Sequence, residues 1–275
     1  MPADGYRCPS CATQYLHGGY CQACRRERRS YVKLRPADAT AIVRLGDVPL
    51  RPLPRVAFPG WPAITVTLNG GLPLGKVLLL FAPPGMGKST LALGLCSGLD
   101  DALFVSSEQE AGDLREIGER CTYPCIDEVA FTAQSGIRGV EEAVEESKPR
   151  FIVIDSLQEI ARETGLVETV GRIVALARAH AAPVLLTCQV TKDVSWAGPR
   201  AVEHLVDGMA ELVSVEASLT DSREMCLSDG RTSSPVSKER AASTLTFTIV
   251  GKYRAGPVGR VARLRRLESG RIEEV

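Results

Sequence analysis

The stretch that decides the fold is K76-V-L-L-L-F-A-P-P-G-M-G-K-S89, an apolar run that leads through a glycine-rich turn into a helix-like segment. Residues 76–81 are almost all apolar without alternation, as in a strand that is buried on both faces. The following segment, residues 88–99, has the composition of a helix. A strand, a glycine-rich turn and a helix in this order are the context of a phosphate-binding P-loop. The stretch therefore predicts an α/β fold with an anion site where this strand ends.

Each part of the turn has a chemical reason to bind a nucleotide. The backbone N–H groups of a glycine-rich turn converge on a phosphate, and the helix N-terminus adds partial positive charge. Lys88 can reach the β- and γ-phosphates, and the hydroxyl of Ser89 can bind Mg²⁺. Ala82 stands where the strict pattern has glycine, but it is small enough for the turn. We expect ATP and Mg²⁺ to bind at Ala82, Pro83, Pro84, Gly85, Met86, Gly87, Lys88, Ser89 and Thr90.

Short apolar runs alternate with helix-like segments up to about residue 187. The further candidate strands are residues 102–106, 128–131, 150–155 and 183–187, and the further helix-like segments are residues 110–121, 138–147 and 167–181. Alternation of this kind is typical of a mostly parallel sheet flanked by helices. We expect that fold for a domain spanning residues 61–275.

Acidic residues follow two of these strands, and the carboxyl ends of parallel strands meet at one edge of a sheet. Asp155 ends one apolar run and is expected to hold Mg²⁺ together with Ser89. Ser156 comes next, so the carboxylate that activates water must come from elsewhere. Glu108, just past residues 102–106, is the best candidate. The alternative is that Glu108 is a solvent-facing acid that opens a helix.

Gln189 follows the run 183–187 and completes the predicted edge. Its amide can donate a hydrogen bond to a γ-phosphate and so report the loss of that phosphate to the segment that follows. The alternative is an ordinary polar residue after a strand, which is common.

Four of the nine cysteines lie in the first 24 residues, in two C-x-x-C pairs. Four thiolates complete the tetrahedron that Zn²⁺ prefers, and so short a module has no core to fold around without metal. A redox pair of the thioredoxin kind and coincidence are the alternatives. We expect a zinc knuckle over residues 1–28 and a Pro/Arg-rich linker over residues 29–60. The expected zinc ligands are Cys8, Cys11, Cys21 and Cys24.

Composition excludes several classes of protein. The chain has 275 residues, of which 44% are hydrophobic, and 33 Lys+Arg balance 33 Asp+Glu, so it is globular and not wholly disordered. No apolar run reaches the roughly 20 residues needed to cross a bilayer, and the first residues lack the apolar core of a secretory signal. We therefore expect a cytoplasmic protein without a membrane partner. Both ends are basic, which suits either a polyanion or solvated arginines.

Several motifs together resemble the bacterial RadA/Sms proteins over roughly residues 6–270. They are the cysteine pairs, N69-G-G-L-P-L-G-K76, A82-P-P-G-M-G-K-S89, V105-S-S-E108, V153-I-D-S-L-Q-E-I160 and V190-T-K-D-V-S-W-A-G-P-R-A-V-E-H-L-V-D207. The resemblance implies a RecA-like P-loop ATPase core with an N-terminal zinc finger. It also implies hexameric rings on DNA that process strand-exchange intermediates and promote branch migration in recombinational DNA repair.

The resemblance assigns roles to particular residues. Lys88 and Ser89 are similar to the Walker A pair, Asp155 to the Walker B acid and Glu108 to the catalytic glutamate. K252-Y-R-A-G256 resembles the family's Lys-x-Arg-x-Gly motif, which implies that Lys252 and Arg254 reach the nucleotide of a neighbouring subunit and stabilise developing charge. A basic strand at the surface is the alternative.

The chain also departs from the family pattern. The family usually continues into a Lon-like C-terminal domain, whereas this chain stops at Val275, and residues 217–243 look like an insertion.

Lys192, Trp196 and Arg200 follow the predicted sensor, where cations and an aromatic face can bind single-stranded DNA. A Trp196 buried as an anchor is the alternative to one that stacks on a base.

Three functions remain open from the residues. The first is a DNA-dependent ATPase that works as a homo-oligomeric ring on single-stranded or branched DNA, with a recombinase as a further partner. The second is an ATP-gated assembly or binding protein with slow or absent hydrolysis. The third is an ATPase that serves a protein partner through its zinc knuckle.

Overall fold

The computed structural model describes residues 5–7, 14–15, 32–34, 53–189, 200–215 and 241–275. Strands β1 (Gly5–Arg7), β2 (Gln14–Tyr15) and β3 (Val32–Leu34) form a small antiparallel sheet in the order β2-β1-β3. The four cysteines of the predicted knuckle lie outside the described residues, as do Lys192, Trp196 and almost all of the predicted insertion.

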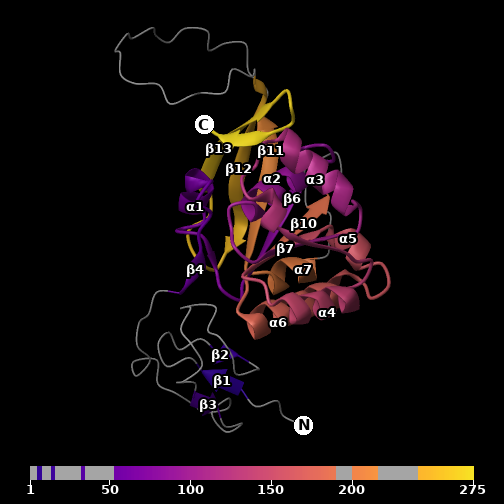
Figure 1. Ribbon diagram of the computed structural model, residues 1–275. Helices are drawn as coiled ribbons and strands as arrows, with labels where there is room; N and C mark the ends of the chain where they lie inside the picture. The colour runs from indigo at the N-terminus through magenta and orange to yellow at the C-terminus, as the bar shows by residue number, and fades with distance from the viewer. Residues whose placement is uncertain (1–4, 8–13, 16–31, 35–52, 190–199, 216–240) are drawn as a thin grey trace.

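A nine-stranded sheet organises the rest of the chain, in the order β14-β13-β12-β11-β6-β10-β9-β7-β8 (Figure 1). Six neighbouring strands run parallel: β6 (Val77–Ala82), β7 (Ala102–Ser106), β8 (Ala130–Ala133), β9 (Phe151–Asp155), β10 (Val184–Gln189) and β11 (Gly208–Val215). Three antiparallel strands extend the sheet beyond β11: β12 (Ala241–Tyr253), β13 (Val261–Leu267) and β14 (Ile272–Glu274).

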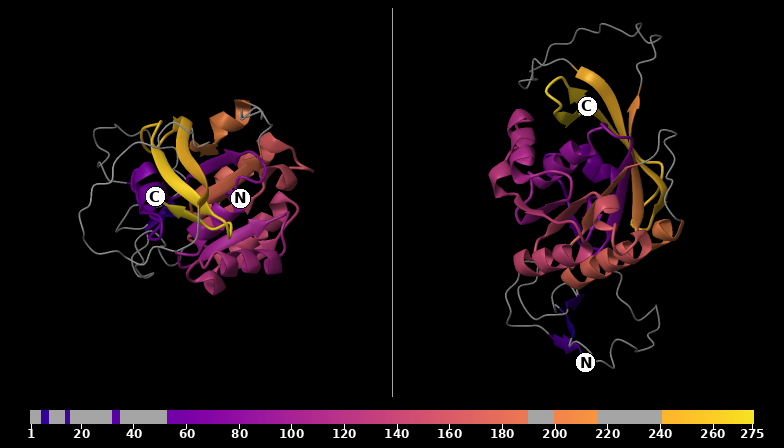
Figure 2. Two further views of the ribbon diagram at one scale, coloured as in Figure 1. Left: turned by 90° about the horizontal axis from the view of Figure 1, so that it is seen from above. Right: turned by 90° about the vertical axis from the view of Figure 1, so that its right-hand side faces the viewer.

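Helices cover both faces of the parallel strands (Figure 2). On one face lie α1 (Pro62–Thr67), α2 (Lys88–Cys96) and α3 (Ala111–Arg120), and on the other lie α4 (Ile137–Ser147), α5 (Leu157–Ile160), α6 (Leu166–His180) and α7 (Arg200–Leu205). Alternate residues of a strand point into the two cores on either side of the sheet. In β9, Phe151 and Val153 pack in the core under α1, α2 and α3, whereas Ile152 and Ile154 pack in the core under α4 to α7. This double burial is why the strands are apolar without alternation. Within the described ranges, no helix is both long and apolar enough to span a membrane.

The expected mostly parallel sheet flanked by helices is confirmed, with two differences in its strands. The candidate strand at 128–131 is shifted, because the short 3₁₀-helix η4 (Ile126–Glu128) precedes β8. β8 is an edge strand whose side chains are only half-buried or exposed, so its apolar signal is weak. Strands β11 to β14 follow the last predicted strand. Of these, β12 to β14 are antiparallel, and antiparallel strands with one covered face lack a continuous apolar run.

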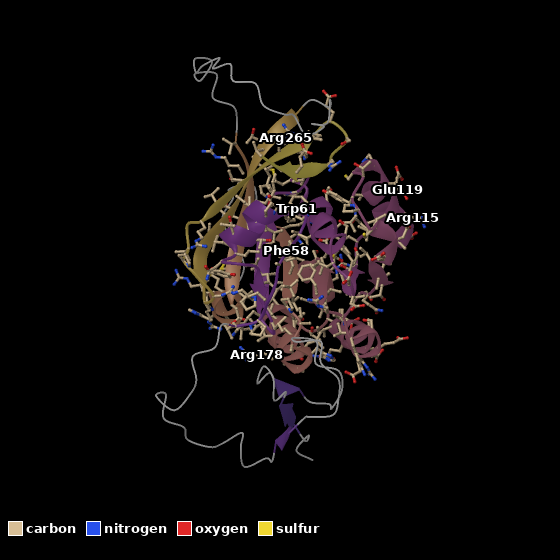
Figure 3. The ribbon with its side chains drawn as sticks, turned by 60° about the vertical axis from the view of Figure 1, so that its left-hand side comes forward. Phe58, Trp61, Arg115, Glu119, Arg178 and Arg265 are labelled. Carbon is tan, nitrogen blue, oxygen red and sulfur yellow. The ribbon has the colours of Figure 1, made fainter. Side chains whose placement is uncertain are left out.

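The packed core begins before residue 61, within the segment assigned to the linker. Strand β4 (Arg55–Val56) pairs with β5 (Leu72–Pro73), and the ring of Phe58 meets that of Phe151 edge-on at a centroid distance of 5.2 Å. Phe58 and Trp61 both lie inside the core (Figure 3). The indole Nε1 of Trp61 donates to the carbonyl of Gly94 at 2.9 Å. Prolines set the backbone of this segment without preventing its apolar side chains from packing.

Candidate functional site

The glycine-rich turn joins β6 to α2 through two residues in the left-handed region. Gly85 has φ 74° and Gly87, the N-cap of α2, has φ 93°. Residues other than glycine are strained in this backbone conformation. A Cβ added to Gly85 would meet no atom within 4 Å, so this side of the turn is open. A turn with two glycines in the left-handed region, beside a helix N-terminus, fits a phosphate group.

Lys88 is buried beneath the turn, with 7% of its surface exposed. Its Nζ donates to the carbonyl of Ala82 at 2.9 Å and to that of Pro83 at 3.2 Å. Burial lowers the pKa of the Lys88 ammonium, and the nearby Asp155 opposes this most strongly. Both hydrogen-bond partners of Nζ are neutral carbonyls, so they do not neutralise the charge of the ammonium.

Asp155, at the end of β9, lies beside the start of α2. Its carboxylate accepts a hydrogen bond from the hydroxyl of Thr187, and the hydroxyl of Ser89 is close enough to influence its pKa. Burial raises the pKa of this carboxyl group, and the two hydroxyls oppose the rise. A carboxylate and a hydroxyl are the kinds of ligand that Mg²⁺ binds, so this pair of side chains fits the expected ion.

Glu108 is joined to the residue that follows Asp155. The hydroxyl of Ser156 donates to Oε1 of Glu108 at 2.6 Å, and Ser107 N donates to the carbonyl of Asp155 at 3.0 Å. The Oγ of Ser106 accepts from the backbone N–H of Glu108 at 3.2 Å. The turn after β7 is thereby held against the end of β9, while Glu108 itself is exposed.

Gln189 ends β10 in register with Ala82, so it lies at the same edge as the glycine-rich turn. Its carbonyl accepts a hydrogen bond from Nε2 of Gln158 at 2.9 Å, and the same nitrogen lies 2.8 Å from the sulfur of Cys188. Gln189 is exposed. Gln158 thus ties α5 to the end of β10.

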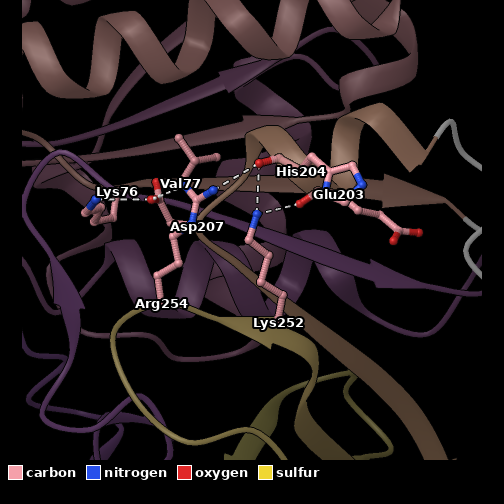
Figure 4. A network of polar contacts seen from close by, with 7 residues as sticks. All are labelled: Lys76, Val77, Glu203, His204, Asp207, Lys252 and Arg254. Atoms are coloured by element: carbon pink, nitrogen blue, oxygen red, sulfur yellow. Dashed lines mark hydrogen bonds and ion pairs between the residues drawn. The ribbon is translucent and has the colours of Figure 1, made fainter.

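Lys252 and Arg254 lie at the opposite, amino edge of the sheet. Tyr253 between them is paired with Gly208, which is in register with Leu78 near the start of β6. Their side chains contact the end of α7 and Asp207 (Figure 4). Because they lie at the other edge, they do not join the glycine-rich turn of their own chain.

The structure therefore gathers Lys88, Ser89, Asp155, Glu108 and Gln189 at one edge and leaves the two cations of the Lys-x-Arg-x-Gly motif at the other. Arg200 is exposed at the start of α7. Within the described ranges, His, Cys, Asp and Glu side chains form no group of three or more suited to a metal ion.

Some contacts at the turn could not be expected from the local sequence. Nη1 of Arg266 on β13 donates to the carbonyl of Gly85 at 2.8 Å, and a Cβ on Gly87 would meet Cδ1 of Ile272 at 2.8 Å. The hairpin of β13 and β14 thus packs against the glycine-rich turn. Contacts between segments about 180 residues apart leave no local signal. Thr187, by contrast, precedes the predicted sensor by two residues and could have been found as a polar residue inside an apolar strand.

The fold and this edge define an α/β protein with a P-loop-type turn beside a buried aspartate. No family model matches the chain. The chain does have homologues named DNA repair protein RadA: one from Mycobacterium tuberculosis is 37% identical over 51% of this chain, and one from Escherichia coli is 27% identical over 75%. A homologue from Streptococcus pneumoniae is 34% identical over 51% of the chain.

The resemblance to the RadA proteins is thereby confirmed. The matched part covers 32% of the length of the mycobacterial relative and 51% of that of the E. coli relative, so the chain spans a third to a half of these proteins.

Proposed function

We propose that this chain binds ATP with Mg²⁺ at residues 82–90 and hydrolyses it in a DNA-dependent manner, as a RadA-like ATPase of recombinational DNA repair. The observation that supports this most directly is the convergence of Lys88, Asp155 and Glu108 at one edge of the sheet. Homology to proteins named DNA repair protein RadA supports the same conclusion.

Each residue at this edge has a distinct task in the proposal. Lys88 would exchange its carbonyl partners for the phosphates, and Gln189 would donate to the γ-phosphate. Glu108 would accept a proton from a water molecule while the oxygen of that water attacks the γ-phosphorus. The bond between the γ-phosphorus and the bridging oxygen would break, which releases ADP and phosphate. Mg²⁺ between Ser89 and Asp155 would neutralise charge on the phosphates.

The proposal assigns Lys252 and Arg254 to the nucleotide of a neighbouring copy. Their place at the amino edge supports this, because they are remote from the turn of their own chain. Cations supplied by a neighbour make hydrolysis depend on assembly into a ring or another homo-oligomer.

DNA and zinc belong to the proposal as well. Arg200, exposed at the start of α7, and Lys192 would contact phosphates of DNA, and Trp196 would stack on an unpaired base. The four cysteines would hold structural Zn²⁺. Steeply weaker DNA binding at higher salt is expected for such a surface.

Steady-state phosphate release, measured with and without single-stranded DNA, tests the function. Lys88→Ala should abolish turnover and weaken nucleotide binding. Glu108→Gln should lower turnover by about 10²- to 10⁴-fold while nucleotide remains bound. Glu116→Gln, an exposed glutamate on α3, is the matched control and should keep the parent rate.

The outcomes separate two functions. Parent-level hydrolysis by Lys88→Ala refutes the site. Tight binding of ATP with no hydrolysis by the parent, with or without DNA, instead supports an ATP-gated assembly or partner-binding protein.

A further inference from the structure

Asp207 is a buried carboxylate that joins three parts of the amino edge. With 3% of its surface exposed, it accepts from Nζ of Lys76 at 3.1 Å, from Nη1 of Arg254 at 3.2 Å and from the backbone N–H of Val77 at 3.2 Å. Its own carbonyl accepts from Arg254 N at 2.8 Å. The start of β6, the end of β12 and the turn between α7 and β11 therefore meet at Asp207 (Figure 4).

The end of α7 holds the second cation. Nζ of Lys252 donates to the carbonyls of Glu203 at 2.8 Å and His204 at 2.9 Å, and Nη2 of Arg254 donates to that of His204 at 3.2 Å. The last carbonyls of a helix lack partners inside the helix and carry partial negative charge, so they attract cations. Both side chains are thus fixed by the same short element.

The hydrogen bonds described above do not use all the N–H donors of Lys252 and Arg254. An ammonium has three N–H donors and a guanidinium has five, more than the bonds just described use. The side chain of Arg254 is 46% exposed, whereas that of its partner Asp207 is 3% exposed. A cation that is anchored from beneath and has unused donors at the surface is pre-organised for an external anion.

We propose that Asp207 is a positioning residue, which holds Arg254, and with the end of α7 also Lys252, in place for the nucleotide bound by a second copy of this chain. This inference rests on the proposed function. Asp207 does not touch the nucleotide in this arrangement; it acts through Arg254.

A purely structural role of Asp207 is the alternative, because an aspartate that joins several strands also stabilises the fold. The two roles differ in whether a partner can compensate. In a mixed oligomer, a subunit with an intact nucleotide site but misplaced cations works when its neighbour supplies good cations. A subunit that is misfolded does not.

The experiment mixes variants and measures phosphate release. Lys88→Ala has an inactive nucleotide site but keeps Lys252 and Arg254. Arg254→Ala keeps the nucleotide site but lacks one of the two cations. Asp207→Asn is the variant under test. We expect Asp207→Asn alone to lose at least tenfold in turnover. Mixed in equal amounts with Lys88→Ala, either of the other two should regain activity at about one quarter of the interfaces. Glu141→Gln, which removes the carboxylate partner of Arg172, is the matched control and should keep the parent rate.

A second readout does not depend on turnover. In the presence of excess Lys88→Ala, the affinity of Asp207→Asn for a fluorescent ATP analogue should equal that of the parent, because its own glycine-rich turn lies at the other edge and its neighbours supply intact cations. Asp207→Glu keeps the charge but lengthens the side chain, and it should show the same loss and the same rescue; it replaces Asp207→Asn if circular dichroism shows that variant unfolded.

Two results overturn the inference, and they are distinguishable. If Arg254→Ala is rescued by Lys88→Ala, but the Asp207 variants are either fully active alone or not rescued, Asp207 has no positioning role and the proposed function stands. If Arg254→Ala is not rescued, cations do not act between copies, and that part of the proposed function fails together with the inference.

Discussion

Ser156 and Glu108 are joined by a hydrogen bond of 2.6 Å from the serine hydroxyl to Oε1 of the glutamate. Ser156 directly follows the buried Asp155, and Glu108 lies just past the end of β7, so the bond links two neighbouring strands at the candidate site. It leaves the second carboxylate oxygen of Glu108 free of this bond. Ser156 therefore orients the carboxylate to which the proposal assigns proton transfer from water.

Ser156→Ala should slow ATP hydrolysis by about tenfold, the equivalent of about 1.4 kcal/mol, because a hydrogen bond to a charged group is lost. Nucleotide affinity should not change, because Ser156 contacts the glutamate and not the turn. Single-turnover hydrolysis and equilibrium binding measure the two quantities. Ser147→Ala, which removes an exposed hydroxyl on α4, is the control. An unchanged rate in Ser156→Ala would mean that Glu108 is oriented by other contacts.

Gly87→Ala should lower the free energy of unfolding by about 1–3 kcal/mol, since φ is 93° and the new Cβ would meet Ile272 at 2.8 Å. Urea denaturation measures this. Gly171→Ala is the matched control with the opposite sign: Gly171 lies inside α6, where an added Cβ would have no atom within 4 Å, and alanine there should stabilise by up to about 1 kcal/mol. Equal stabilities for the two variants would contradict the strain at Gly87.

The parallel part of the fold could be predicted because its signal is local. A strand such as Phe151–Asp155 is buried on both faces and therefore apolar throughout. The antiparallel part could not, since β13 (V-A-R-L-R-R-L) buries only some of its side chains and carries three arginines. Its place next to β12 depends on contacts that no short segment encodes.

The candidate site divides in the same way. The sequence predicts a shared edge for Asp155, Glu108 and Gln189, because each lies at or just past the carboxyl end of a strand in a parallel sheet. The contact of Arg266 with the carbonyl of Gly85 was missed, because it joins β13 to a turn far away in the sequence. The cations at the amino edge were predicted from resemblance alone, and Asp207, which holds one of them, gave no signal beyond its place in the V-E-H-L-V-D stretch.

Glu274→Ala should destabilise the protein by about 1–2 kcal/mol, because this carboxylate completes the N-terminus of α1. Its oxygens accept from the N–H groups of Ala63 at 2.7 Å and Ile64 at 2.8 Å, and α1 has no side-chain cap of its own. Glu274→Gln keeps one acceptor oxygen and should lose about half as much. Urea denaturation gives the values, with the exposed Glu268→Gln as the control. A parent-like Glu274→Ala would show that water replaces the carboxylate without cost.

Cys188 and Cys125 should differ sharply in their reaction with iodoacetamide. Burial raises the pKa of the Cys188 thiol to about 12, and only the thiolate reacts. At pH 8 about one Cys188 in 10⁴ is ionised, and the fraction rises tenfold with each pH unit up to that pKa. Cys125 is exposed. Peptide mapping by mass spectrometry at pH 8 should find Cys125 modified and Cys188 intact in the folded protein, with both modified in urea. Equal labelling of the two in the folded protein would contradict the burial of Cys188 beside Gln158 at the candidate site.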